Sequence, residues 1–223
     1  MKKKSKIIIA TVLGFVLALS LALLIPFSVL GVRSNQIKTD YSSLKNESHY
    51  SQKAEVEGIE LVSQHISCGY ATIEMLSSYY GKTVSEDDLD EKNSGTVSTS
   101  STNGFLNEVN QSIPSQSFQK KTYLENAAFL KEIHDSLSKQ HPVAIEWAAQ
   151  YEGEWTLHFS LVSSLDIGND EVVVYNPYGY IEKLSIEPFL ERTTFQAYEK
   201  MPLFLKLGFA YGAFDKNACF HAE

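Results

Sequence analysis

The chain has 223 residues, of which 43% are hydrophobic and 21% charged, and this composition excludes a fibrous or wholly disordered protein. All 27 acidic residues follow position 31, together with only 15 of the 19 basic ones, so the body of the chain has a net charge of −12. Because contacts to phosphates need lysine and arginine, such a body argues against a nucleic-acid partner. It is compatible with a cationic peptide substrate.

Residues 1–6 are a basic segment with four lysines, and residues 7–32 carry no charge. An apolar run of this length is enough to cross a hydrocarbon core of about 30 Å. We therefore predict a cytoplasmic segment at 1–6 and a single-pass membrane anchor at 7–32, with the C-terminal domain outside the cell membrane. The alternative is a cleaved signal peptide, with its exit near Ser28–Gly31, and a secreted protein.

Residues 33–57 are polar and poor in aliphatic side chains, which predicts a stalk with low internal order. The folded domain is expected to span 58–223. Its first half shows helical spacing of apolar residues at 68–80 and 124–140. Ser85 with Asp88 is typical of the cap of a short acidic helix, and Asn103 of the start of another that runs through Val109.

Strand-like runs follow at 143–148, 157–164, 171–175 and 180–184, with a turn at 167–170 and a short helix at 185–192. The apolar stretch from Met201 fits helix or strand equally. Helices followed by strands joined through short turns predict an α+β fold, in which N-terminal helices pack on an antiparallel sheet.

Cys68 and Cys219 are the two cysteines of the chain. In an exported protein they are candidates for one disulfide. Cys68, however, begins the predicted helix 68–80, where the helix dipole favours a thiolate and free backbone amides can hold an oxyanion. Gly69 beside it is expected to let a substrate backbone approach. Gln64, four residues upstream, is a candidate side-chain donor to the oxyanion, or simply a loop glutamine.

A nucleophilic thiol needs a base, and His158 is the best candidate among six histidines because it lies in an apolar strand-like run, WTLHFSLV. The turn at 167–170 pairs this run with EVVVYNPYG, which brings Asn176 back near His158. Asn176 is therefore the candidate for orienting the imidazole. A structural histidine and ordinary Asn-Pro turn chemistry are the alternatives.

Together, Gln64, the CGYA run from Cys68, the YYGKTVS run from Tyr79, His158 and the NPYG run from Asn176 resemble the C39-like peptidase family, which comprises bacteriocin-processing, double-glycine peptidases. The resemblance implies a papain-like fold over roughly 58–195, a peptide substrate and no cofactor. It also implies Cys68 as nucleophile, His158 as base, Asn176 as orienting residue and Gln64 at the oxyanion site. The function expected is that of a membrane-anchored extracytoplasmic cysteine peptidase.

Two alternatives stay open. Gln64 lies closer to Cys68 than is usual in that family, which favours a catalytically silent binding or immunity-type module. The same Cys–His chemistry also serves a cell-wall amidase or acyltransferase. No metal is expected, because no cysteines and histidines have the spacing of zinc ligands.

Overall fold

The structure is a computed structural model that describes residues 2–35, 37–195, 202–203 and 214–223. Six α-helices, one 3-10 helix and seven strands are defined in this part of the chain. In chain order they are α1 (Lys2–Asn35), η1 (Ser42–Asn46), β1 (Ala54–Glu55), α2 (Cys68–Tyr79), α3 (Glu86–Lys92), α4 (Thr102–Ser112), β2 (Phe118–Thr122), α5 (Asn126–Ser138), β3 (Val143–Tyr151), β4 (Glu154–Asp166), β5 (Glu171–Asn176), β6 (Tyr180–Leu184), α6 (Ile186–Thr193) and β7 (Ala218–Ala222).

One antiparallel sheet forms the centre of the domain, with strand order β2-β7-β3-β4-β5-β6 and with β1 paired to β4. β3, β4, β5 and β6 follow one another as hairpins, as the turn at 167–170 predicts. β7 comes from the C-terminus and lies between β2 and β3, where Cys219 is opposite Lys121 on one side and Ile145 on the other.

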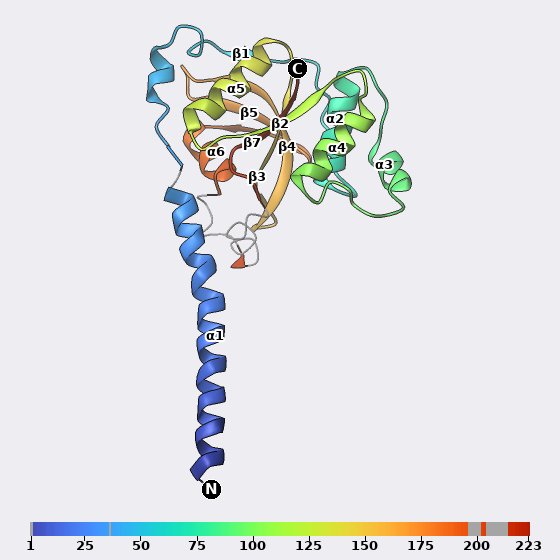
Figure 1. The fold of residues 1–223 in the computed structure, drawn as a ribbon. Helices are drawn as coiled ribbons and strands as arrows, with labels where there is room; N and C mark the ends of the chain where they lie inside the picture. The colour runs from blue at the N-terminus through green and yellow to red at the C-terminus, as the bar shows by residue number, and fades with distance from the viewer. Residues whose placement is uncertain (1, 36, 196–201, 204–213) are drawn as a thin grey trace.

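Helices cover the sheet on both sides, with α5 and α6 on one and α2 and α4 on the other, while α3 lies farther out beside α2 (Figure 1). Trp147 on β3 packs against Phe189 of α6, whereas Phe159 on the neighbouring strand stacks on Phe105 of α4. Since successive side chains of a strand point to opposite faces and Trp147 pairs with His158, these two contacts place α6 and α4 on opposite faces of the sheet. The predicted mixture of helices and an antiparallel sheet is confirmed.

The expected stalk at 33–57 contributes to the domain instead. Leu44 is fully buried, and Ala54 and Val56 are 4% and 3% exposed. β1 pairs with β4, and the Val56 backbone N–H donates to the Ser163 carbonyl at 2.8 Å. The polar composition of 33–57 did not predict these contacts, because a few apolar side chains are enough to pack a mostly polar segment against a sheet.

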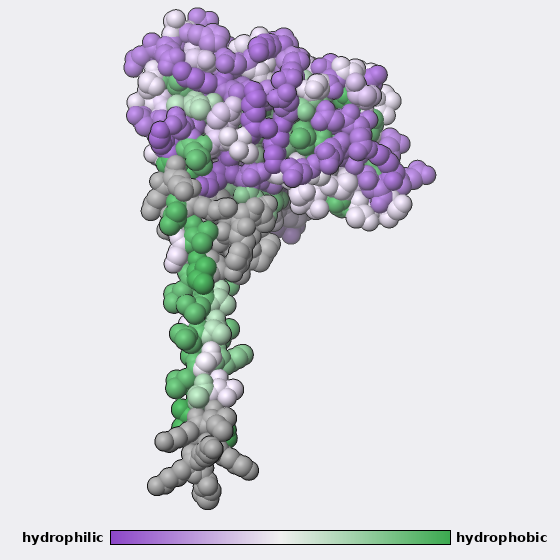
Figure 2. Space-filling model, viewed as in Figure 1, coloured by the Kyte–Doolittle hydropathy of each residue, from purple (hydrophilic) through white to green (hydrophobic). Residues whose placement is uncertain are grey.

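α1 projects from the domain as a single rod in Figure 1, and Figure 2 shows apolar residues along it beneath a mostly hydrophilic domain surface. Its described side chains include several large apolar ones that are more than half exposed, among them Ile8, Leu13 and Phe15. Among the described residues, no helix meets the combined criteria of length and apolarity for crossing a membrane.

The helices predicted at 68–80 and 124–140 and the four predicted strands are confirmed within a few residues at their ends. The short acidic helix begins with the expected capping box between Ser85 and Asp88. β2 and β7 were not predicted. The stretch from Met201, left open between helix and strand, lies almost wholly outside the described residues.

Candidate active site

Cys68 is the first residue of α2, as predicted. Ser67 caps the helix in an extended conformation, and its hydroxyl accepts from the Tyr70 backbone N–H at 3.1 Å. The thiol is therefore mounted where the helix has unpaired backbone N–H groups and the positive end of its dipole. This is a geometry suited to a nucleophile whose attack generates an oxyanion.

A buried carboxylate fixes the segment that leads into α2. Glu86, the first residue of α3, is fully buried. Its two oxygens accept from the backbone N–H groups of His65 at 3.0 Å, Ile66 at 2.9 Å and Ser67 at 2.9 Å. Three hydrogen bonds to one carboxylate hold three consecutive residues, so the position of Cys68 is determined by α3 as well as by its own helix.

Gly69 serves packing rather than substrate access. A Cβ at this position would lie 2.2 Å from Oγ1 of Thr99, a residue that is 4% exposed. The space that we expected a substrate backbone to use is therefore filled by the loop before α4.

We predict that Gly69→Ala lowers the free energy of unfolding by about 1–3 kcal/mol, because overpacking a buried contact costs more than the helix propensity of alanine returns. Urea denaturation of Gly69→Ala, Thr99→Gly and the double variant measures this. In the Thr99→Gly background the alanine should be neutral or stabilising. An equal loss in both backgrounds would show that Thr99 is not the obstacle.

Beyond Leu161, which is opposite Tyr175, β5 no longer pairs with β4. The Cys68 sulfur lies at this open edge, against the backbone N–H of Phe159. Burial raises the pKa of the Cys68 thiol, and the amides of Phe159, Gly69 and Cys68 itself oppose that shift without cancelling it. We expected the helix terminus to lower this pKa, and that expectation is corrected: desolvation of the thiolate outweighs the amide dipoles.

His158 and Asn176 are brought together by the β4–β5 hairpin. His158 Nε2 lies 2.8 Å from Asn176 Oδ1, and the two residues are 1% and 0% exposed. Since an amide oxygen only accepts, Nε2 donates this bond. Nδ1 is then the ring nitrogen that can accept a proton.

Tyr178 covers the imidazole and was missed by the sequence analysis. Its ring stacks on that of His158 with centroids 4.0 Å apart and planes 23° apart. Its backbone N–H donates to Asn176 Oδ1 at 2.9 Å, and its hydroxyl is 2.8 Å from Thr156 Oγ1. Tyr178 thus fixes both the amide and the ring. The Asn-Pro-Tyr-Gly run carried this signal, but it is also typical of any turn.

Burial lowers the pKa of His158 to about 4, although the hydrogen bond that its Nε2–H donates to Asn176 acts in the opposite direction. With the pKa of Cys68 raised, both groups are neutral near pH 7. These shifts favour a neutral thiol and a neutral imidazole over a thiolate–imidazolium ion pair.

Within the described residues no hydrogen bond joins Cys68 to His158, and their spatial relation follows from the contacts of their neighbours. Cys68 meets the backbone of Phe159, the residue after His158. Burial raises the pKa of Tyr178, whose ring stacks on His158, and a thiolate at Cys68 adds to that shift. The thiol therefore lies against residue 159 of β4, which follows the residue that carries the imidazole.

Gln64 lies at the same end of the sheet. Its backbone N–H donates to the Pro177 carbonyl at 2.7 Å, which ties the segment before α2 to the turn after Asn176. Its Oε1 is buried without a hydrogen-bond partner among the described residues. A half-turn about the last side-chain bond would present the amide N–H₂ there instead. A buried amide end awaiting a partner suits an oxyanion-binding side chain.

The two cysteines are both free. Cys219 is fully buried within the sheet, and burial raises the pKa of its thiol far above the usual range. The alternative of a disulfide between them is therefore not realised in this structure. Cys219 has the environment of an unreactive core cysteine.

His49, His134 and Asp135 offer ligand-type atoms within 4.8 Å of one another, a cluster that spacing in the sequence did not reveal. His49 Nε2 is 3.1 Å from Asp135 Oδ1, and His134 Nε2 is 3.0 Å from the Gln52 carbonyl. These groups satisfy one another at the junction of α5 with the segment after η1. That junction carries none of the four predicted site residues.

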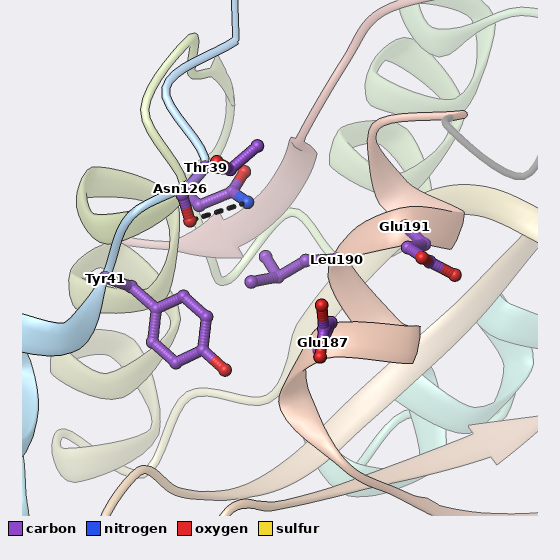
Figure 3. Close-up of a pocket in the computed structure, with 6 residues that line it drawn as sticks. All are labelled: Thr39, Tyr41, Asn126, Glu187, Leu190 and Glu191. Atoms are coloured by element: carbon purple, nitrogen blue, oxygen red, sulfur yellow. Dashed lines mark hydrogen bonds between the residues drawn. The ribbon is translucent and has the colours of Figure 1, made fainter.

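A cavity of about 390 Å³ lies between residues 39–41, the start of α5 and α6 (Figure 3). Its lining consists of Thr39, Tyr41, Asn126, Glu187, Leu190 and Glu191. None of the four predicted site residues belongs to this lining. Asn126 Nδ2 donates to the Thr39 carbonyl at 3.4 Å across one wall, so the cavity follows from how the N-terminal segment packs on α5.

Comparison with known proteins gave three results. The model of the Peptidase C39 like family matches residues 45–202. No curated protein matches the sequence. Among solved structures, a double glycine motif protease from an AMS/PCAT transporter, in complex with the leader peptide, is similar with a TM-score of 0.48 and 14% identity, covering 77% of this chain and 94% of that one.

Proposed function

Because the chain belongs to the Peptidase C39 like family, we propose that it is a cysteine peptidase that hydrolyses peptide bonds with Cys68 as nucleophile and His158 as general base. The observation that supports this most is the buried contact of 2.8 Å between His158 Nε2 and Asn176 Oδ1. An amide acceptor on one ring nitrogen leaves the other as a base. The thiol of Cys68 lies at the same end of β4.

In this mechanism Nδ1 of His158 removes the thiol proton as Cys68 Sγ attacks the substrate carbonyl carbon. The carbonyl π electrons move to oxygen, and backbone N–H groups at the start of α2, with the Gln64 amide, stabilise the oxyanion. The intermediate collapses, the C–N bond breaks and the imidazolium donates its proton to the leaving amine. Water, deprotonated by His158, then attacks the thioester and releases the acid and the thiol.

The test is incubation of the protein with a defined mixture of unmodified peptides, followed by mass spectrometry of the products. We expect discrete cleavages that carbamidomethylation of Cys68 by iodoacetamide abolishes. Cleavage at undiminished rate by the alkylated protein would refute the assignment.

A second candidate is a binding module that does not turn over substrate. It is favoured by the raised pKa of Cys68 and by the missing hydrogen bond between Cys68 and His158 within the described residues. Peptides that bind but are recovered intact would support it. An amidase or acyltransferase of cell-wall peptides is distinguished by including muropeptides in the same mixture, since only that activity would alter them selectively.

Membrane anchoring is part of the proposal and is supported by the uncharged run 7–32 and by the exposed apolar side chains of α1. We predict that the full chain stays in the membrane pellet after a carbonate wash, with the domain outside, and that removal of residues 1–35 releases it. The free energy that holds the chain in the membrane comes from transferring the apolar surface of residues 7–32 out of water. Recovery of the full chain in the soluble fraction would contradict this.

A further inference from the structure

Behind Asn176 lies a second layer of buried polar groups that the catalytic steps do not use. Asn176 Nδ2 donates to Glu182 Oε1 at 2.6 Å, across the β5–β6 hairpin. Arg192 of α6 donates to Glu182 through Nη1 at 2.6 Å and Nη2 at 3.3 Å. The side chains of Glu182 and Arg192 are only 14% and 11% exposed. A line of hydrogen bonds thus runs from α6 to the imidazole.

Arg192 is itself held on three sides. Its Nε donates to the Ala148 carbonyl at 2.6 Å, and its guanidinium lies 3.5 Å above the centre of the Trp147 ring. Trp147 is fully buried, and its Nε1 donates to Ser160 Oγ at 3.0 Å. A planar guanidinium fixed in this way presents its remaining N–H groups in one direction, so Glu182 is held against α6 and β3.

The geometry determines which way the Asn176 amide points. A carboxamide is nearly symmetrical in shape, and packing alone does not separate its oxygen from its nitrogen. A carboxylate paired with a guanidinium accepts hydrogen bonds and donates none. Only Nδ2 of Asn176 can therefore face Glu182, and Oδ1, which also accepts from the Tyr178 backbone N–H, faces His158.

We propose that Glu182, held by Arg192, is a positioning residue that fixes the carboxamide of Asn176, so that His158 carries its proton on Nε2 and keeps Nδ1 free as the base. This inference deepens the proposed function, and its activity readout rests on it. Glu182 does not touch the reacting atoms. It acts through Asn176, by excluding the tautomer in which Nδ1 is protonated and unable to receive the proton of Cys68.

The kinetic test compares the effect of Glu182→Gln on kcat/KM in two backgrounds, in which it should have opposite signs. A glutamine at 182 can present either the oxygen or the nitrogen of its amide to Asn176. Glu182→Gln should therefore lower kcat/KM for a cleaved peptide by about 10-fold or more, as the loss of a residue that orients a functional side chain by hydrogen bonding typically does. In the Asn176→Asp background two carboxylates would meet across the 2.6 Å contact, and one would be forced to protonate. There, Glu182→Gln supplies a donor and should raise kcat/KM.

A merely structural role for Glu182 predicts loss in both backgrounds, and that result would overturn the inference. The matched control is Glu171→Gln. Glu171 pairs with Lys183 at 3.6 Å on the same hairpin but has no contact with Asn176. Its substitution should leave kcat/KM unchanged in both backgrounds. An equal loss from Glu171→Gln would also contradict the proposal.

A second readout needs no activity. Nitrogen-15 NMR of the His158 ring at pH 7 reports which nitrogen is protonated. We expect the Nε2–H tautomer alone in the wild type and in Glu171→Gln, and a measurable Nδ1–H population in Glu182→Gln. An unchanged tautomer in Glu182→Gln would refute the positioning role, whatever the kinetics. A locked tautomer in a protein that cleaves no peptide would leave this inference standing and remove the proposed function.

Discussion

Cys68→Ala should lower the rate of peptide hydrolysis on the order of 10³-fold or more, because it removes the thiol that forms the covalent intermediate in the proposed mechanism. The fold should survive, since the substitution removes one sulfur from a half-buried site and leaves the Ser67 cap and the Glu86 hydrogen bonds in place. Steady-state rates, with circular dichroism as a check on the fold, measure both effects.

Cys219→Ala is the matched control. It also removes a thiol, but one that is fully buried in β7 with its pKa raised far above the usual range by burial. The control should retain the wild-type rate. Hydrolysis that persists in Cys68→Ala and disappears in Cys219→Ala would reverse the assignment of the nucleophile.

Glu146→Gln should raise the free energy of unfolding by about 3 kcal/mol at pH 7. Glu146 is 1% exposed on β3, and burial raises its pKa from 4.5 to about 8, with the Asp215 backbone N–H, which donates to Oε2 at 3.3 Å, acting against the shift. Glutamine keeps an oxygen for that hydrogen bond. Glutamine also removes the free-energy cost of keeping the Glu146 carboxyl protonated in the folded protein at a pH at which the unfolded chain releases that proton.

The pH dependence follows from the direction of this shift. The folded-state pKa of Glu146 lies above the unfolded value. The contribution of this side chain to the free energy of unfolding is therefore fully present below pH 4.5 and is lost as the pH rises through about 8. The wild type should therefore lose stability relative to Glu146→Gln by about 1.4 kcal/mol per pH unit between these limits. Urea titrations at several pH values measure the slope.

For Glu146, the matched control is Glu154→Gln, which alters an exposed glutamate at the start of β4. The difference between this variant and the wild type should be small at every pH. A Glu146→Gln protein that is no more stable than the wild type at pH 7 would show that the side chain is not held as a buried neutral acid.

Much of the site could be predicted from local patterns. Cys68 follows a serine cap and opens an apolar helical run, and the turn at 167–170 pairs two strands so that Asn176 returns to His158. Each of these steps needs only neighbouring residues or one short hairpin. These features can therefore be predicted from the sequence without knowledge of the tertiary packing.

The remainder depends on contacts between distant segments. The pKa of Cys68 was expected to fall and instead rises, because the desolvation of the sulfur is caused by surrounding elements that the sequence does not place. Arg192 lies on α6 and meets Glu182 only after folding. β2 has a largely polar sequence, FQKKT, and pairs with a strand from the chain terminus, so no local alternation marks it.

The central claim, that Cys68 attacks with the help of His158, is tested most directly by trapping with an electrophilic peptide and locating the adduct by tandem mass spectrometry. The adduct should form on Cys68 in the wild type, should be absent in Cys68→Ala, and should form at least about 10²-fold more slowly in His158→Ala. Trapping of Cys68 at the same rate with and without His158 would contradict the account.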